Sequence, residues 1–169
     1  MKPQLPKSDQ DAARENGWVL LAFRLPREPS TPRIAVWRKL KRLGAAQLVD
    51  GLVALPLDSR NRERFEWLAD DVTEAGGEAT IWIGRLASAA QERQLAARMR
   101  ETVAAEYRAL VADAEAVRSQ AAGRRRRSLG RLRRELRRIR LRDYFPPEER
   151  ALAQRAIDEL AASFEEVVS

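Results

Sequence analysis

The sequence predicts an α+β protein in which a small antiparallel sheet with two helices is followed by a C-terminal extension of antiparallel helices. Three observations predict this class. Apolar runs typical of strands alternate with stripes of helical period over residues 17–85. Asp50-Gly51, a strong signal for a two-residue hairpin, separates two of these runs. Over residues 86–169 the composition changes to alanine, leucine and charged residues, which is typical of long helices.

Residues 18–25 (WVLLAFRL) form a nearly continuous apolar run, and its length fits a central strand buried on both faces. Residues 1–16 before it are polar, so we expect a flexible N-terminus. Thr31 as N-cap and Pro32 at the first helical position open a helix that stops at Gly44. Its inward positions are Val36, Leu40 and Leu43, joined by Trp37, and its outward face carries Arg38, Lys41 and Arg42.

A hairpin, a second helix and a last strand complete the sheet domain. Two short apolar runs flank the hairpin turn, and Asp58 or Ser59 then caps the helix. The inward stripe of this helix is Phe65, Leu68, Val72 and Ala75. Gly76-Gly77 closes it, and residues 79–83 (ATIWI) alternate as the last strand. The order βαββαβ is the ferredoxin-like pattern, with two helices on one face of a four-stranded antiparallel sheet.

The C-terminal extension is expected to hold three helices, over residues 87–121, residues 123–142 and from Pro147 onward. The first has the stripe Leu95, Met99, Val103, Tyr107, Leu110, Ala114 and Val117, and the last has Ala153, Ile157, Leu160, Phe164 and Val167. At about 1.5 Å per residue the last two helices together match the first in length, so we expect them to lie end to end along it. The alternative is that the long helices pair between two chains.

The positive charge of the chain is concentrated in residues 123–142 (GRRRRSLGRLRRELRRIRLR). This segment holds eleven arginines and one acid, a net of +10, whereas the other 21 basic and 24 acidic side chains give −3. Its apolar residues recur at spacings of three, four and three, so they form a stripe that docks while the arginines occupy the other faces. They are Leu129, Leu132, Leu136 and Ile139. One interpretation is that the arginines pair with acids on neighbouring helices. Because so few acids lie within the segment, an external anion such as phosphate is the favoured partner.

Cysteine and histidine are missing from the sequence. Their absence excludes disulfides, thiolate metal sites, cysteine or serine–histidine nucleophiles and histidine proton shuttles, so we expect no cofactor and no enzyme activity. No apolar run approaches the roughly 20 residues of a membrane span, and the N-terminus lacks a signal-peptide core. We therefore expect a cytoplasmic protein that does not bind membranes.

Three blocks of the sequence carry a family resemblance. They are residues 18–56, residues 66–82 (EWLADDVTEAGGEATIW) and residues 132–160, in which an arginine helix runs into an Asp-Tyr-Phe-Pro turn. In the same order, they resemble the amino-terminal domain of the ChrB chromate-resistance regulators, and the first block is similar, more weakly, to the middle domain of PaaX-type repressors. The resemblance implies a DNA-binding transcriptional regulator that controls a chromate-efflux operon and releases DNA when chromate is present. It also implies that the long form of the family continues beyond Ser169 into another domain.

The expected DNA contacts are the arginines of residues 123–142 and a secondary patch on the helix over residues 31–43. The set is Arg124, Arg125, Arg126, Arg127, Arg131, Arg133, Arg134, Arg137 and Arg138, with Arg38, Lys41 and Arg42. Phosphate contacts would supply affinity and position the protein on double-stranded DNA, without reading its base sequence. Paired half-sites would need two such helices, so we expect a homodimer.

Chromate or a similar oxyanion is the expected inducer. A divalent tetrahedral oxyanion can be held by arginines and by the amides of a helix N-terminus. The loop before the first helix supplies such groups, namely Arg24, Arg27, Ser30, Thr31 and Arg33. The alternative is that Ser30 and Thr31 only cap the helix. Without cysteine, sensing would have to read charge and shape rather than thiol oxidation.

Two other functions fit parts of the sequence. Small CRISPR adaptation nucleases share the split βαβ fold and place a metal-binding acid at the end of the first strand. Here that strand ends in Arg24-Leu25, and Glu28 has no obvious carboxylate partner, so a metal site is disfavoured. A non-catalytic interaction module, whose basic helix binds an acidic partner or a membrane, is the other alternative. A stripe of Leu and Ile without Trp or Phe ranks lipid below DNA.

Overall fold

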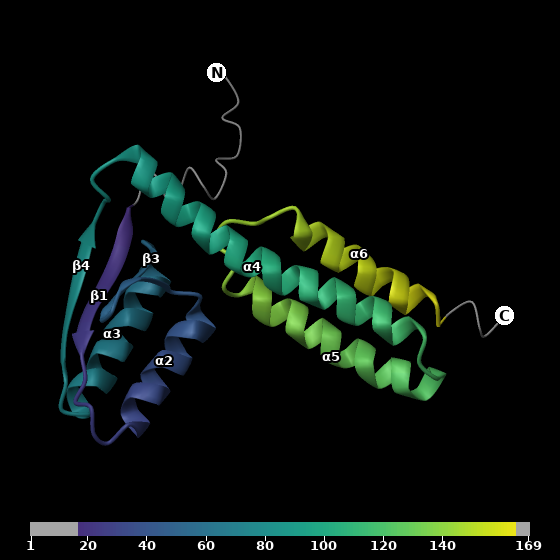
Figure 1. Cartoon of the computed structure of the whole chain (residues 1–169), viewed down its shortest axis with the longest axis horizontal. Coiled ribbons are helices and arrows are strands. Elements are labelled where there is room, and N and C mark those ends of the chain that lie inside the picture. Colours follow the sequence, from purple (N-terminus) through teal and green to yellow (C-terminus); the bar gives the residue numbers. More distant parts are fainter. Residues whose placement is uncertain (1–16, 165–169) are drawn as a thin grey trace. The chain divides into compact units, whose positions relative to one another are not determined.

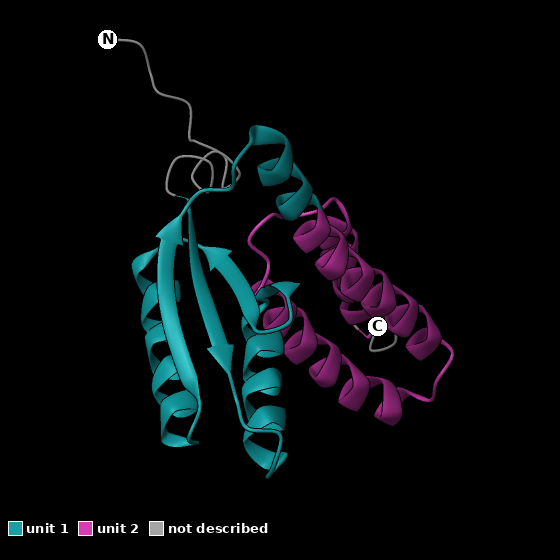
Figure 2. Cartoon of the chain, turned by 60° about the vertical axis from the view of Figure 1, so that its left-hand side comes forward, with its two compact units in different colours: residues 1–97 teal, residues 98–169 magenta. Residues whose placement is uncertain are grey.

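The computed structural model describes residues 17–164, which divide into two compact units. Unit 1 extends to Ala97 and unit 2 begins at Arg98, so the division falls inside one long helix (Figure 2). Two sequence expectations, the flexible segment of residues 1–16 and the inward position of Val167, lie outside the described residues.

Unit 1 contains a four-stranded sheet, two helices and the first turns of a third. In chain order its elements are β1 (Trp18–Arg24), α2 (Thr31–Leu43), β2 (Ala46–Val49), β3 (Leu52–Pro56), α3 (Ser59–Glu74), β4 (Glu78–Gly84) and the start of α4 (Ala89–Arg118). The strand order is β2-β3-β1-β4, and every neighbouring pair is antiparallel. Figures 1 and 2 show α2 and α3 on the same face of the sheet. The predicted α+β class and the predicted order of six elements are confirmed.

β1 is a central strand, as predicted, but its two faces differ in burial. Val19 and Leu21 have no exposed surface, whereas Leu20 and Ala22 on the opposite face are partly exposed. The expectation of complete burial on both faces was wrong, because α2 and α3 cover only one face of the sheet.

Asp50 and Gly51 form the turn between β2 and β3, as predicted. Gly51 has a φ of 75°, a left-handed conformation that glycine adopts without steric cost. A Cβ atom at this position would lie 2.5 Å from the carbonyl oxygen of Phe23, so only glycine allows β1 to approach the turn. Phe23 donates its backbone N–H to the carbonyl of Gly51 at 2.8 Å. The hairpin turn is therefore fastened to the end of β1.

α2 starts without the cap that the sequence predicted. Ser30, rather than Thr31, precedes the first helical residue, and neither side chain makes a capping hydrogen bond. Ser30 has a helical backbone (φ −76°, ψ −19°), whereas a capping side chain normally requires an extended one. The other end of α2 is as predicted, because Gly44 closes it with a φ of 72° and Val36 and Leu40 are buried.

Trp37 is the residue of α2 that differs most from the sequence prediction. Its side chain is 54% exposed, so the expectation that it joins the inward stripe was wrong. One residue corresponds to about 100° around a helix, which turns Trp37 away from the buried Val36. The ammonium of Lys41 lies 4.4 Å from the centroid of the Trp37 ring. Arg38, Lys41 and Arg42 are exposed, as predicted.

α3 has its predicted cap and stripe. The side chain of Asp58 accepts a hydrogen bond from the backbone N–H of Asn61 at 2.6 Å. The Asn61 side chain is 1% exposed and donates to the carbonyl of Pro56 at 2.9 Å, which ties the start of α3 to the end of β3. Phe65 and Val72 are completely buried.

Unit 2 is a bundle of three helices, formed by α4 from Arg98 onward, α5 (Ala122–Arg140) and α6 (Glu149–Ala162). The predicted stripes meet in one apolar core made of Val103, Tyr107, Leu110, Ala114, Val117, Leu129, Leu132, Leu136, Ile139, Ala153, Ile157 and Leu160. No helix within residues 17–164 is both long and apolar enough to cross a membrane.

The expectation that α5 and α6 lie end to end along α4 was wrong. Arg108 pairs with Glu149 at 2.8 Å, and Arg118 pairs with Glu159, so α6 runs parallel to α4. α5 runs back along the same stretch of α4, and α5 and α6 contact each other (Figure 1). The eight residues of the connection, 141–148, reverse the chain between them. Side-by-side packing gives each apolar stripe two neighbours instead of one, which buries more apolar surface.

Candidate nucleic-acid interface

α5 presents its arginines because its apolar stripe is fully docked. Leu132 and Ile139 are 0% and 1% exposed, and Leu129 and Leu136 are also buried in the core of unit 2. This fixes the rotation of the helix about its axis, so the remaining faces point away from the core. The predicted docking stripe is confirmed.

Nine of the eleven arginines in residues 123–142 are exposed, namely Arg124, Arg126, Arg127, Arg131, Arg133, Arg134, Arg137, Arg138 and Arg140. The other two are partly buried. The guanidinium of Arg125 lies 5.3 Å from the centroid of the Phe164 ring. Arg125 is therefore directed toward the C-terminal end of unit 2 rather than to solvent, although the sequence placed it among the DNA contacts.

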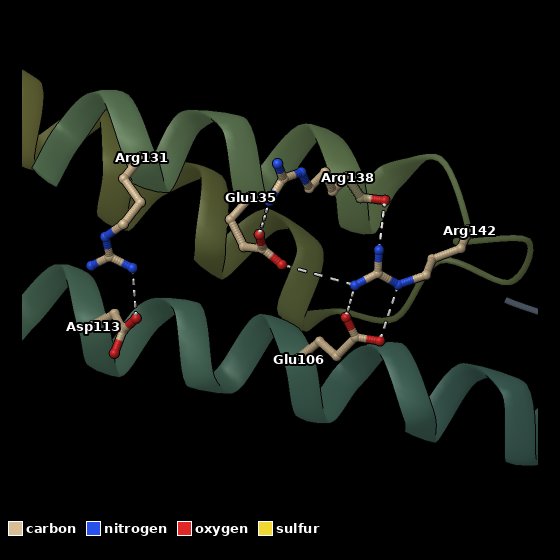
Figure 3. Close-up of polar contacts among 6 residues, drawn as sticks. All are labelled: Glu106, Asp113, Arg131, Glu135, Arg138 and Arg142. Carbon is tan, nitrogen blue, oxygen red and sulfur yellow. Dashed lines mark hydrogen bonds and ion pairs between the residues drawn. The ribbon is translucent and has the colours of Figure 1, made fainter. Parts of the chain in front are cut away.

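Three of the eleven arginines in residues 123–142 pair with acids, as Figure 3 shows. Arg131 reaches Asp113 at 3.4 Å, and Arg138 reaches Glu135 at 3.4 Å. All four side chains are at least 38% exposed, so each pair contributes about 0–1 kcal/mol.

Arg142 has a different role, because its side chain is only 17% exposed. Its Nε donates to Glu106 at 3.2 Å, a second donor bonds the same carboxylate, and Glu135 lies 3.9 Å away (Figure 3). A two-pronged contact of this kind fixes geometry as well as charge. Arg142 therefore holds the chain at the end of α5 against α4.

A second contact holds the same turn. The hydroxyl of Tyr107, on α4, donates to the carboxylate of Asp143 at 2.8 Å, and Arg150 lies 3.7 Å from that carboxylate. Burial of the phenol, and then its hydrogen bond to Asp143, raise the pKa of Tyr107 well above its usual range. The turn after α5 is thus fixed by α4 and α6.

Within residues 17–164, six exposed arginines of α5 have neither a carboxylate at ion-pair distance nor a hydrogen bond to another side chain. They are Arg124, Arg126, Arg127, Arg133, Arg134 and Arg137. Arg134, Arg137, Arg138 and Arg140 also border a surface hollow of about 510 Å³ together with Leu141. The interpretation that neighbouring acids neutralise the arginine helix does not hold for these six side chains. They form an electropositive surface with spare hydrogen-bond donors.

The secondary cationic patch lies in unit 1, on the exposed side of α2. Arg38, Lys41 and Arg42 have no carboxylate partner among the described residues. Lys39 between them does have one, because its ammonium lies 2.5 Å from Asp71 of α3. The patch therefore stays positively charged.

The proposed oxyanion residues do not surround one hollow. Arg24 pairs with Glu78 at 2.9 Å and borders a hollow with Gly76 and Gly77. Arg33 borders a different cavity beside α2, and its guanidinium donates to the backbone carbonyl of Arg27 at 3.4 Å. Ser30 and Thr31 lie at the exposed start of α2 and border neither hollow.

Sequence reasoning missed three of these features, namely the Arg142–Glu106 anchor, the Tyr107–Asp143 bond and the cavity beside Trp37. The one sequence signal of the cavity was a tryptophan next to the cations of α2, and that side chain was predicted to join the inward stripe instead. As to metals, residues 17–164 contain no group of three or more acidic side chains arranged to hold an ion.

Comparison with known proteins places this chain in a family. Residues 33–169 match the family described as Protein ChrB, N-terminal. Protein ChrB of Cupriavidus metallidurans is 33% identical over 84 residues, which cover 50% of this chain and 25% of that protein. The matched region therefore spans a quarter of the relative's length. No solved structure matches the chain.

Proposed function

The chain belongs to the family of ChrB N-terminal domains, as its three sequence blocks indicated, and we propose that it is a DNA-binding transcriptional regulator of a chromate-resistance operon. This family is associated with chromate resistance. The observation that carries the DNA-binding part is the row of exposed α5 arginines without carboxylate partners.

The arrangement of these arginines suits a phosphate backbone. Arg133 and Arg137 are four residues apart and therefore neighbours on one side of α5, and Arg134 and Arg138 are neighbours in the same way. Guanidinium groups bind phosphate through two parallel hydrogen bonds. Because the docked stripe fixes the backbone of α5, little backbone freedom remains to be lost on binding.

We also propose that the six-element part of unit 1 has the ferredoxin-like fold, which its strand order β2-β3-β1-β4 supports. Its role in this proposal is to carry a second cationic surface. Arg38, Lys41 and Arg42 give additional phosphate contacts there. Phosphate contacts supply affinity without sequence information, so base readout must come from other groups.

We further propose that the protein acts as a homodimer, since two copies of α5 would match paired half-sites on DNA. β4 is an edge strand of seven residues, and its Trp82 and Ile83 are 61% and 52% exposed. An edge strand with exposed apolar side chains is a template for pairing with a second copy. Sedimentation equilibrium should show a dimer, and Trp82→Glu should shift it toward monomer. A monomer at the concentrations that saturate DNA would contradict this.

Chromate or a similar oxyanion is the proposed inducer. Arg27 and Arg33 at the start of α2 are the groups that would hold it, together with Ser30 and Thr31, whereas Arg24 would first have to leave Glu78. If so, chromate should release DNA from the complex at concentrations at which sulfate does not. Equal release by both anions would show only a salt effect.

The test of DNA binding compares two triple variants that remove the same charge. Arg133→Gln, Arg134→Gln and Arg137→Gln remove exposed α5 arginines, whereas Arg60→Gln, Arg93→Gln and Arg155→Gln remove exposed arginines elsewhere. Fluorescence anisotropy of a labelled duplex across a salt series gives the slope of log affinity against log salt. Each lost phosphate contact flattens that slope by about 0.9, so the α5 variant should lose about 2.7.

The control variant should keep the wild-type slope. Equal slopes for all three proteins would remove α5 from the interface. The same duplex, recovered after incubation with Mg²⁺ or Mn²⁺, also tests our proposal that the protein is not an enzyme. Cleavage by the pure protein would favour the nuclease alternative instead.

A further inference from the structure

A cavity of about 550 Å³ lies along one flank of α2 in unit 1. Its walls come from α2, from the end of β1 and from β2 and β3 with their turn. This volume is in the range of protein sites for small organic molecules, roughly 300–1,000 Å³. The cavity shares Arg38 and Lys41 with the secondary cationic patch, but most of its other lining residues are apolar.

The walls include large apolar side chains that remain accessible. Ile34 and Trp37 are 46% and 54% exposed, and Phe23 and Leu25 are partly exposed. A single exposed apolar residue is ordinary on a protein surface. Here two exposed and two partly exposed apolar residues border one cavity, so a ligand in it would gain apolar contact on several sides.

The rim of the cavity is positively charged. Arg33, Arg38 and Lys41 border it, and its lining contains no acid. Among the described residues none of these three cations has a carboxylate partner. Lys41 instead lies over the ring of Trp37. The cavity therefore combines three uncompensated cations with an apolar floor.

Only one class of small ligand satisfies both features. A bare oxyanion such as sulfate would neutralise the cations and leave the apolar walls in contact with water. A neutral apolar molecule would bury the walls and leave the cations without a partner. We propose that this cavity binds an organic carboxylate or sulfonate with a flat, aromatic body, which packs against Trp37 while Arg38 and Lys41 hold the anionic group. This site does not depend on DNA binding.

The first experiment uses 2-naphthoate as the probe and two compounds that each lack one half of it. 2-Naphthalenemethanol has the ring without the charge, and sulfate has the charge without the ring. Titrations of the full chain are followed by calorimetry and by the indole N–H signals of the four tryptophans in ¹H–¹⁵N spectra. The naphthoate titration should saturate and shift the Trp37 signal, with Trp67 and Trp82 unchanged.

The comparison compounds should separate the two parts of the site. 2-Naphthalenemethanol should bind at least about tenfold more weakly, because a hydrogen bond to a charged group contributes more to affinity than a hydrogen bond between neutral groups. Sulfate at equal concentration should not displace naphthoate. Displacement by sulfate would show a bare oxyanion site, and equal affinity for the alcohol would show that the cations are not used. Either result overturns the proposal.

Matched variants then identify the residues. Trp37→Ala should weaken naphthoate binding at least about tenfold, since burial of an aromatic surface supplies much of its affinity. Trp67→Ala, which removes a similarly exposed tryptophan on α3, should not weaken it. Arg38→Gln should also weaken it, and Arg60→Gln, an exposed arginine outside the cavity, should not. Arg38 is exposed, so its substitution tests the site without touching the core. If Trp37→Ala and Trp67→Ala bind equally well, naphthoate binds nonspecifically and the cavity has no such role.

Discussion

α2 and α5 are both amphipathic helices that bury an apolar stripe and present cations, yet their surroundings differ. The exposed cations of α5 lie among other arginines, and the one exposed apolar side chain in its surface hollow is Leu141. The cations of α2 lie beside Ile34 and Trp37 and border a cavity. Positive charge alone therefore does not identify a partner. In our two proposals, the neighbouring side chains distinguish the phosphate surface of α5 from the organic-anion site beside α2.

The two helices are also held differently. The α5 segment is fixed by a bundle core and by the Arg142–Glu106 pair at its end. α2 is fixed by Val36 and Leu40 against the sheet domain and by the exposed Lys39–Asp71 pair with α3. Since a buried stripe contributes more than an exposed ion pair, the two helices depend mainly on their apolar faces.

Among the predicted effects, the largest is the loss of stability expected when a side chain is removed from the apolar face of α5. Leu132→Ala removes a completely buried side chain and should lower the free energy of unfolding by about 2–5 kcal/mol. Leu141→Ala, at a position 60% exposed near the end of the same helix, should change it by less than about 0.5 kcal/mol. Urea unfolding followed by circular dichroism measures both. Equal losses would mean that the stripe does not dock α5.

Removing the cations of α2 compares the contributions of α2 and α5 to DNA binding. Arg38→Gln, Lys41→Gln and Arg42→Gln together remove as much charge as the α5 triple variant. We expect the salt slope to fall by less than the roughly 2.7 expected for α5, because α2 is the secondary patch and because two of its cations face the cavity. Anisotropy across the same salt series checks this. A larger fall for α2 than for α5 would reverse the assignment of the main surface.

Much of this architecture follows from local sequence patterns. The Asp50-Gly51 turn, the Asp58 cap and the Gly44 end of α2 depend on one or two residues each, and all three are confirmed. The docking stripe of α5 also follows from spacing, because Leu132 and Ile139 can face the core only if the arginines face away. Local rules of this kind need no knowledge of the partner element.

The errors concern how elements meet. Helix length alone could not distinguish end-to-end from side-by-side packing of α5 and α6, because the direction of the chain is set by the turn at residues 141–148. Trp37 was predicted to join the inward stripe of α2, but its position beside Val36 on the helix turns it outward. The Tyr107–Asp143 bond joins residues 36 positions apart, so no local pattern could reveal it.

The burial of Tyr107 and its hydrogen bond to Asp143 predict how the stability of unit 2 depends on pH. Burial raises the pKa of Tyr107 in the folded state, whereas an unfolded tyrosine ionises near its ordinary value of about 10. Below this value both states keep the proton, and its contribution to stability is constant. Above it the unfolded state loses the proton first, so stability should fall as the pH rises.

Tyr107→Phe isolates this effect. The variant loses the hydroxyl and leaves Asp143 without that donor, so we expect it to be less stable by about 1–3 kcal/mol near neutral pH. Its stability should then decline less steeply above pH 10 than that of the wild type. Urea midpoints measured from pH 8 to 11 give both values. Parallel curves for the two proteins would show that Tyr107 titrates normally in the fold.

The smallest effect on the free energy of unfolding is expected at Trp37, which the sequence analysis placed on the inward stripe of α2. With 54% of its side chain exposed, Trp37 contributes little burial, so Trp37→Ala should change the free energy of unfolding by no more than about 0.5 kcal/mol. Trp67→Ala, at 61% exposure, should behave alike. Leu40→Ala, three residues further along α2 and buried, should instead cost about 2–5 kcal/mol. Urea unfolding of the three variants decides the matter. If Trp37→Ala were as costly as Leu40→Ala, the ring would be part of the core and would not be available to a ligand in the α2 cavity.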